Sequence, residues 1–222
     1  MFGVTTPAVQ RISAALRDEF ECLVFHATGV GGRSMEKLVD SGTIAGVVDL
    51  TPPKSPTCWW GACCPRRQTG SARSSARVRP MSRSLGALDM VDFGARETVP
   101  ERFSRRKLHV HNPQVTLMRT SSEENAEIGR WIGERLNQID GPVRFFIPEL
   151  GLSALDAPGG PFWDPEADAA LFRALEQTVR QTSHRQILRV RRNINEPEFS
   201  STVVAAFRSL MGRASERRRI VR

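Results

Sequence analysis

Apolar and polar positions along the chain follow two periods, which alternate from one segment to the next. Amphipathic helices place apolar residues every three or four positions, whereas buried strands read as short apolar runs. Helical spacing occurs in residues 8–20, 35–42, 123–138, 164–181 and 197–213. Strand-like runs occur in residues 1–5, 22–27, 44–50, 143–149 and 186–190, with an extended stretch at 108–120. This alternation predicts an α/β fold of the Rossmann or flavodoxin kind, a mostly parallel sheet with helices on both faces in three layers.

Local signals mark the ends of these helices. Ser, Thr and Asp accept hydrogen bonds from the first free amides of a helix, and Pro suits its first position. Such starts are expected at Thr6 with Pro7, at Ser121 or Ser122, and at Asp164 with Pro165. Gly42 is expected to close the helix at 35–42. Residues 28–34 are predicted to form a glycine-rich loop, and residues 150–163 a long loop between a strand and a helix.

One stretch, residues 51–83, breaks this pattern. Its thirty-three residues contain no Leu, Ile, Phe, Asp, Glu or Asn, and three of the four cysteines lie in it. The cysteines lack the paired C-x2-C spacing of a zinc site, so no metal site is predicted. The stretch carries seven basic residues and no acid, which leaves a formal charge of +1 on the other 189 residues. Nucleic-acid binding therefore depends on this stretch alone, and we do not expect it.

The genetic code offers a different explanation of the stretch. Reading the third base of each codon with the first two of the next turns Cys58-Trp59-Trp60-Gly61 into Leu-Val-Gly, and Cys63-Cys64 into Leu, whichever codons are used. With GC-rich third bases, residues 53–65 become an amphipathic helix. We infer a frameshift between about residue 51 and residue 84. As given, the stretch is expected to be irregular and to leave apolar surface uncovered, which predicts low stability.

The two ends of the chain and its overall composition suggest a location and a domain division. No apolar run reaches the ~18 residues of a membrane span, and the first ten residues do not form a signal peptide. A cytoplasmic protein with no membrane association is therefore expected. Residues 1–212 are predicted to form a single α/β domain, followed by a basic tail at 213–222.

Candidate binding residues gather where strands are followed by helices. Glycines at such a turn allow backbone amides to face an anion, and the helix start adds partial positive charge. The proposed anion-binding set is Thr5, Thr6, Thr28, Gly29, Gly31, Gly32, Arg33, Ser34, Asn112 and Arg119. A tight structural turn is the alternative for the glycines, and helix capping is the alternative for Thr6. The glycine pattern is neither a Walker motif nor G-x-G-x-x-G.

Two residues are candidates for acid/base catalysis. His26 ends an expected strand, the place where α/β proteins bind ligands, and Asp89 follows another apolar segment. A packed histidine and an aspartate bonded to loop amides are the alternatives. Asp49 and His111 are further polar candidates. The loop at 150–163 offers Ser153, Asp156, Gly159 and Gly160 and is long enough to be a lid; Trp131 and Trp163 are expected to anchor core or lid.

Several motifs together resemble the Tm-one-like ATP-binding domain family, which includes a plant virus-resistance protein. They are "MFGVTTP", "LVFHATGVGGRSMEKLVDSG", "GVVDLT", "GALDMVDFGARETVPERF", "HNPQVTLMRTSSEENAEIGRWIGERLN" and "GLSALDAPGGPFWDPEADAALF". The resemblance is to the C-terminal half of the family. It implies ATP as a cofactor, another α/β domain upstream and self-association. From the candidate residues, we expect a small-molecule ligand at the carboxyl ends of the strands, between Thr5–Thr6, His26–Arg33 and Asp89. A non-catalytic protein-interaction module is the competing hypothesis.

Overall fold

A parallel four-stranded sheet forms the centre of the molecule. The computed structural model describes residues 3–27, 29–52 and 79–220; for Gly29, Arg33 and residues 213–220 it describes the backbone. The strands are β1 (Val47–Asp49), β2 (Met81–Ser84), β6 (Val143–Pro148) and β7 (Arg185–Val190), in the order β1-β2-β6-β7. All three pairings are parallel. The sheet confirms the predicted α/β class.

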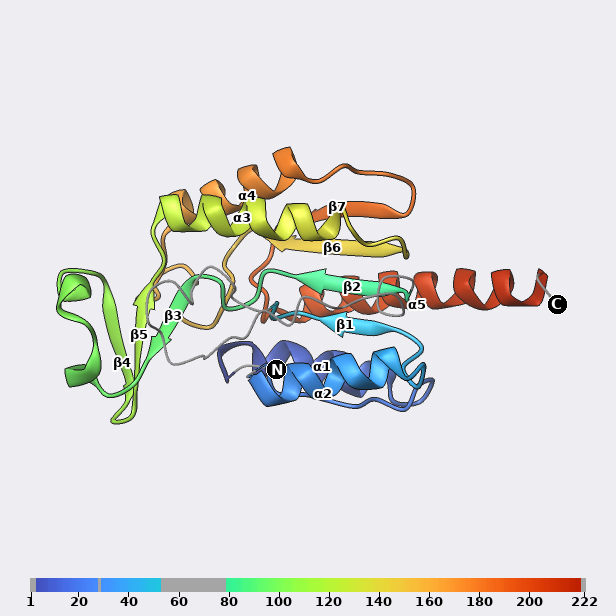
Figure 1. Cartoon of the computed structure of the whole chain (residues 1–222), viewed down its shortest axis with the longest axis horizontal. Helices are drawn as coiled ribbons and strands as arrows, with labels where there is room; N and C mark the ends of the chain where they lie inside the picture. Colours follow the sequence, from blue (N-terminus) through green and yellow to red (C-terminus); the bar gives the residue numbers. More distant parts are fainter. Residues whose placement is uncertain (1–2, 28, 53–78, 221–222) are drawn as a thin grey trace.

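Helices cover both faces of this sheet (Figure 1). They are α1 (Thr6–Leu16), α2 (Gly29–Asp40), α3 (Ser122–Leu136), α4 (Pro165–Thr178) and α5 (Pro197–Ile220). Val143, Phe145 and Ile147 of β6 pack in one core cluster with α3 and α4. Phe146 packs in a second cluster with α1 and α5. Adjacent residues of β6 thus face opposite helical layers, which is why the strand is apolar at every position except Arg144.

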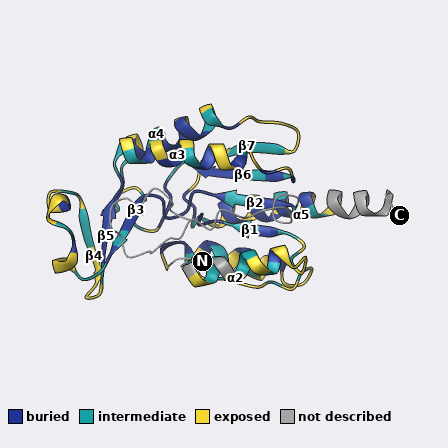
Figure 2. Cartoon of the chain, viewed as in Figure 1, coloured by how far each residue is buried: buried dark blue, intermediate teal, exposed yellow. Residues whose placement is uncertain are grey.

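Burial follows the same layers (Figure 2). The largest fully buried side chains include Phe145, Phe146, Phe199 and Ile128, so both sides of the sheet are closed by packed aromatic and aliphatic groups. The helices expose their other sides to solvent, as their polar positions predicted. Successive side chains of the central strands point to opposite faces of the sheet, and each face therefore has its own hydrophobic core.

A second, smaller sheet stands beyond the ends to which the parallel strands point (Figure 1). It is antiparallel, in the order β3-β5-β4, and its strands are β3 (Met90–Phe93), β4 (Leu108–Asn112) and β5 (Val115–Arg119). Single turns of 3-10 helix, Arg96–Thr98 and Glu101–Phe103, lie between β3 and β4. The extended stretch predicted at 108–120 is thus a hairpin that turns at Pro113. The sheet that this hairpin forms with β3 was not predicted.

Three expectations about the N-terminal third were wrong. Residues 22–27 contain no strand; Leu23 and Val24 are each about half exposed, at 51% and 50%, so neither side of the segment is buried as a strand of the sheet would be. Residues Gly3–Thr5 form a 3-10 turn rather than the end of a strand. The N-cap of α1 is Thr5, without a side-chain capping bond, so Thr6 is not the cap.

The glycine-rich segment and the unusual stretch also differ from expectation. Helix α2 begins at Gly29, so the glycines form its first turns rather than a loop. The last residues of the stretch 51–83 begin strand β2 (Met81–Ser84), which lies between β1 and β6 in the interior of the sheet. Met81, Ser82 and Ser84 are buried there. The expectation of irregular structure is therefore wrong at 81–83, and residues 53–78 lie outside the described residues.

The other predicted boundaries agree with the structure. Ser121 caps α3 in a capping box with Glu124, and Asp164 caps α4 with Pro165 in its first position. Gly42 follows α2 with a φ of +81°, a backbone conformation that favours glycine. The backbone of the predicted tail continues α5 as far as Ile220.

Candidate functional site

The carboxyl ends of the parallel strands meet at one edge of the sheet, and the start of α1 lies across that edge. The carbonyl oxygen of Val4 accepts hydrogen bonds from the backbone N of Ala154 at 3.0 Å and from Nδ2 of Asn195 at 2.9 Å. These donors follow β6 and β7, respectively. The Thr5 and Thr51 hydroxyls, both buried, lie 3.0 Å apart. This contact fixes the start of α1 beside the end of β1.

Gly86 allows the ends of β1 and β2 to pack closely against the start of α1. A Cβ at this position would lie 2.6 Å from the carbonyl oxygen of Leu50 and 3.0 Å from Cγ2 of Thr5. Its own amide donates to the same Leu50 carbonyl at 2.8 Å. The ends of β1 and β2 and the start of α1 therefore form one packed group at the edge where α/β proteins bind ligands.

The first turns of α2 carry the predicted glycines. A Cβ on Gly31 would lie 2.1 Å from the carbonyl oxygen of His26, so only glycine fits there. A Cβ on Gly32 would meet nothing within 4 Å. Ser34 donates from its hydroxyl to the Val30 carbonyl at 3.0 Å, a bond within the helix. His26 is exposed. Thr28 lies outside the described residues, as does the Arg33 side chain.

The helix starts fall into two groups. Helices α3 and α4 have side-chain caps, and each carries acids in its first turn. Helix α1 has no side-chain capping bond, and neither α1 nor α2 has an acid in its first turn. Acids at a helix start interact with the partial positive charge of its free amides. The starts of α1 and α2 therefore have no acid in their own first turns to offset that charge.

Arg119, another predicted anion ligand, is instead buried in a polar cluster. It is the last residue of β5, and its side chain is 3% exposed. Its NH2 atom lies 2.6 Å from Asp168 of α4 and 3.8 Å from Asp156. Its Nε donates to the Phe162 carbonyl at 2.8 Å, and its NH1 to the Asp89 carbonyl at 3.3 Å. One guanidinium thus joins the small sheet to α4 and to the loop at 150–163.

Asp89 and Ser153 complete this cluster. The Ser153 hydroxyl donates to Oδ2 of Asp89 at 2.8 Å and accepts from the backbone N of Leu155 and of Asp156. Both side chains are fully buried. The amide of Asn193 donates to the backbone carbonyls of Ser153 and Asp156, at 3.1 and 2.9 Å. The structure thus brings Asp89, Arg119, Ser153 and Asp156 together around a closed loop.

Burial changes the ionisation of the carboxyl groups in this cluster. Burial, together with the charge of Asp168, raises the pKa of Asp156 to about 8. Burial also raises the pKa of Asp168, although Arg119 opposes that change. Burial lowers the pKa of Arg119, but Asp168, Asp156 and Asp89 more than offset it, so the guanidinium stays charged. At neutral pH Asp156 therefore holds a proton, which it shares in a hydrogen bond with Asp168.

The polar cluster holds the loop at 150–163 in place, and its side chains are closed off from solvent. It consists of Asp89, Arg119, Ser153, Asp156 and Asp168. Each of its carboxyl groups is at least nine-tenths enclosed. Arg119 and Asp168 are separated by 49 positions in sequence. Asp168 lies in the first turn of α4, and no sequence pattern linked it to Arg119.

The remaining candidates have local roles in the structure. Oδ1 of Asn112 accepts from the backbone N of Gln114 at 2.9 Å, which shapes the turn of the hairpin. His111 beside it is exposed. The ring of Trp131 packs against the core, with the Arg135 guanidinium 3.6 Å from its centre. Asp49 pairs with Arg83 of the adjacent strand at 2.5 Å.

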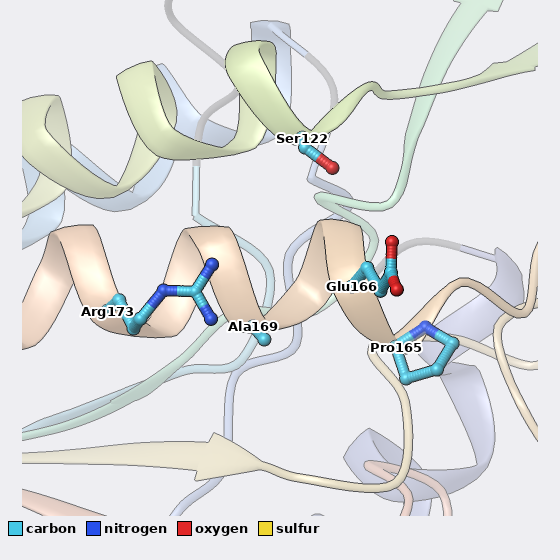
Figure 3. Close-up of a pocket in the computed structure, with 5 residues that line it drawn as sticks. All are labelled: Ser122, Pro165, Glu166, Ala169 and Arg173. Atoms are coloured by element: carbon cyan, nitrogen blue, oxygen red, sulfur yellow. The ribbon is translucent and has the colours of Figure 1, made fainter.

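A pocket of about 460 Å3 opens between the first turns of α3 and α4. Ser122, Pro165, Glu166, Ala169 and Arg173 line it (Figure 3). No sequence motif indicated it, because its residues come from two helices that looked like ordinary amphipathic covers of the sheet.

The described residues contain neither a cluster that could hold a metal ion nor a helix that could span a membrane. No three His, Cys, Asp or Glu side chains in that part of the chain are arranged to hold a metal ion. Across residues 3–27, 29–52 and 79–220, no helix has both the length and the apolar character needed to cross a bilayer.

Comparison with known proteins places the chain in a family. The model of the C-terminal domain of UPF0261, described as an uncharacterised protein family, matches residues 1–211. A UPF0261 protein of Rhizobium meliloti is 53% identical over 210 residues, covering 95% of this chain and 53% of that protein. A UPF0261 protein of Clostridium tetani is 44% identical over 212 residues, covering 95% of this chain and 52% of that protein.

A plant relative belongs to the same group. The ToMV resistance protein Tm-1(GCR237) of Solanum lycopersicum is 44% identical over 214 residues, covering 93% of this chain and 28% of that protein. The chain spans about half the length of the bacterial relatives. These matches confirm the resemblance that the sequence motifs indicated. Since the family model covers nearly the whole sequence, the chain belongs to the UPF0261 family, in the part that forms its C-terminal domain.

Proposed function

We propose that this domain binds a phosphorylated or carboxylated small molecule, such as a nucleotide, at the carboxyl edge of its parallel sheet. The observation that carries the proposal is the difference between the helix starts. Those of α3 and α4 are capped and acidic, whereas those of α1 and α2 have no acid in the first turn. Backbone amides at such a start bind anions well.

The glycines of α2 support the same site. Glycine inside a helix destabilises it by roughly 0.5–1 kcal/mol relative to alanine. Packing against His26 explains Gly31, whereas no neighbouring atom among the described residues requires glycine at position 32. A ligand that approaches the helix backbone closely would require it. Of the two acid/base candidates, His26 is exposed just before this helix, and Asp89 is enclosed by the polar cluster.

ATP is the nucleotide that the family resemblance implies, and we propose that the domain works as one half of an ATP-linked protein. The test is calorimetric titration of ATP and of inorganic phosphate into the chain and two variants. Gly32→Glu places an acid beside the α2 amides. Gly212→Glu is the matched control, because its Cβ also meets nothing within 4 Å in a helix. We expect Gly32→Glu alone to weaken binding at least tenfold; equal affinity in both variants would contradict the proposal.

For the stretch 51–83 we propose the shifted reading frame described above. Ser82 supports it, since its hydroxyl is fully buried in an interior strand and has no hydrogen-bond partner. With a TCN serine codon, the shifted frame reads Met81-Ser82 as valine, an ordinary core residue. Restoring the frame should raise both stability and ATP affinity. Sequencing of the coding DNA decides the matter: an intact frame, together with the same stretch in homologous chains, would exclude the proposal.

A second candidate function, protein interaction, rests on exposed apolar side chains around the start of α2. Leu23, Val24 and Val30 are exposed by 51%, 50% and 69%. Contiguous exposed apolar patches are typical of interaction surfaces, and we propose that these three side chains belong to one. If this surface mediates self-association, Leu23→Ser with Val24→Ser should lower the sedimentation coefficient at high concentration; an unchanged coefficient in an associating protein would refute this role.

A further inference from the structure

The pocket between α3 and α4 has the size and lining of a small-molecule site, and it shares no lining residue with the starts of α1 and α2. Its volume, about 460 Å3, lies within the range of roughly 300–1,000 Å3 that is usual for ligand pockets. Figure 3 shows the Ser122 hydroxyl directed from α3 toward α4, and the Glu166 carboxylate and Arg173 guanidinium on the side of α4 that faces α3. Pro165 and Ala169 supply apolar surface between these polar groups.

Glu166 and Arg173 are opposite charges that do not pair with each other. They are seven positions apart on α4, which separates their backbones by roughly 10 Å along the helix axis. In the part of the chain that the structure describes, neither side chain makes a hydrogen bond or an ion pair. Arg189, by contrast, pairs with both Glu149 and Glu176. The pocket therefore keeps one carboxylate and one guanidinium available for a ligand.

The charges around the pocket disfavour a simple anion or a simple cation. Acids in the first turns of both helices, including Glu123 and Glu166, repel an anion. Arg173 and the partial positive charge of two helix starts repel a cation. A molecule with both charges satisfies both sets of groups. We propose that this pocket binds a zwitterionic small molecule, with Arg173 pairing its carboxylate and Glu166 its ammonium group.

The spacing of the two charges also selects the length of the ligand. Because the charged side chains start roughly 10 Å apart along α4, a ligand whose own charges are separated by several methylene groups fits better than an α-amino acid. Its methylene groups would lie on Pro165 and Ala169, where apolar contact is favourable. The Ser122 hydroxyl, which lies toward the Glu166 end of the pocket in Figure 3, can accept a hydrogen bond from the ammonium group. An ω-amino acid of about six carbons is the simplest such molecule.

The test is a titration of the full chain with a series of ω-amino acids, followed through the amide NMR signals of residues at the pocket. Glycine, 4-aminobutanoate and 6-aminohexanoate vary the charge separation, and hexanoate and hexylamine each carry one charge. We expect saturable shifts with 6-aminohexanoate and at least tenfold weaker binding of glycine, hexanoate and hexylamine. Comparable binding of hexanoate or hexylamine would overturn the proposal, as would the absence of saturable binding.

Variants separate the two charges from general surface effects. Arg173→Gln and Glu166→Gln should each weaken 6-aminohexanoate binding at least tenfold. Arg130→Gln, another exposed arginine in the neighbouring helix, should leave it unchanged. All three change exposed side chains, so thermal unfolding should agree with wild type and show that loss of binding is not loss of fold. Phosphate binding at the carboxyl edge should persist in all three, which distinguishes this site from the proposed function.

Discussion

Replacing Asp156 by asparagine should remove a pH dependence of stability that the polar cluster imposes. The protonated carboxyl of Asp156 donates to Asp168 and accepts from the backbone N of Leu152 at 2.8 Å. An asparagine amide can make both bonds at any pH. The variant therefore keeps the contacts of the cluster and loses only the titration.

The magnitude follows from the pKa of Asp156, which is about 8 in the folded chain and 3.8 ordinarily. Between these values the folded state holds a proton that the unfolded state has lost, so the free energy of unfolding falls as pH rises. The fall is about 1.4 kcal/mol per pH unit, and it ends above pH 8. From pH 6 to pH 8 wild type should lose roughly 2–3 kcal/mol relative to Asp156→Asn. The raised pKa of Asp168 acts in the same direction.

Thermal unfolding of both proteins, followed by circular dichroism from pH 5 to pH 9, measures this difference. At about 2–4 °C per kcal/mol for a chain of this size, the wild-type melting temperature should fall by roughly 5–10 °C more than that of the variant between pH 6 and pH 8. The contributions of the other titrating groups to this difference in melting temperature cancel, because both proteins contain those groups. Parallel melting curves across the range would refute the shared proton.

Four further substitutions test the packing and the polar cluster. Gly31→Ala should destabilise the chain by about 1–3 kcal/mol in urea unfolding, because its Cβ would overlap the His26 carbonyl; unchanged stability would show that α2 starts differently. Ser82→Ala should raise the melting temperature by removing an unpaired buried hydroxyl, whereas Ser84→Ala should lower it by removing a 2.9 Å bond to a carbonyl of β6; equal effects would contradict this contrast. Arg119→Met should cost about 3–5 kcal/mol, and a much smaller loss in urea unfolding would mean that the carboxyl groups of the cluster are not held by its charge.

The layers of the fold were predictable because they depend on local patterns. Helices α3 and α4 have strong periodicity and caps at Ser121 and Asp164, and β6 is an apolar run with turn residues on either side. The segment at 22–27 has an equally apolar run, yet it forms no strand. A strand requires a neighbour to pair with, and sequence pattern alone does not supply one. The small antiparallel sheet was missed for the same reason, since β3 pairs with a strand about 25 residues away.

The candidate site was predictable in its residue types but not in its grouping. Asp89 and Arg119 were both identified. The structure joins them directly, and it adds Ser153 of the long loop and Asp168 of α4, which follow much later in the chain. Burial then determines their roles, because a guanidinium that is 3% exposed supports the fold. The pocket at Glu166 and Arg173 had no signal, since charges seven positions apart on a helix also occur on ordinary solvated faces.

The central claim, anion binding at the carboxyl edge, is tested most directly by following backbone amides during a phosphate titration. In an isotope-labelled sample, we expect saturable shifts of the amide signals of Thr6, Gly31 and Gly32, at the starts of α1 and α2. Gly32→Glu should abolish these shifts, whereas Gly212→Glu should not. Shifts confined to other helix starts, or weak shifts spread over the arginine-rich segments without saturation, would contradict it.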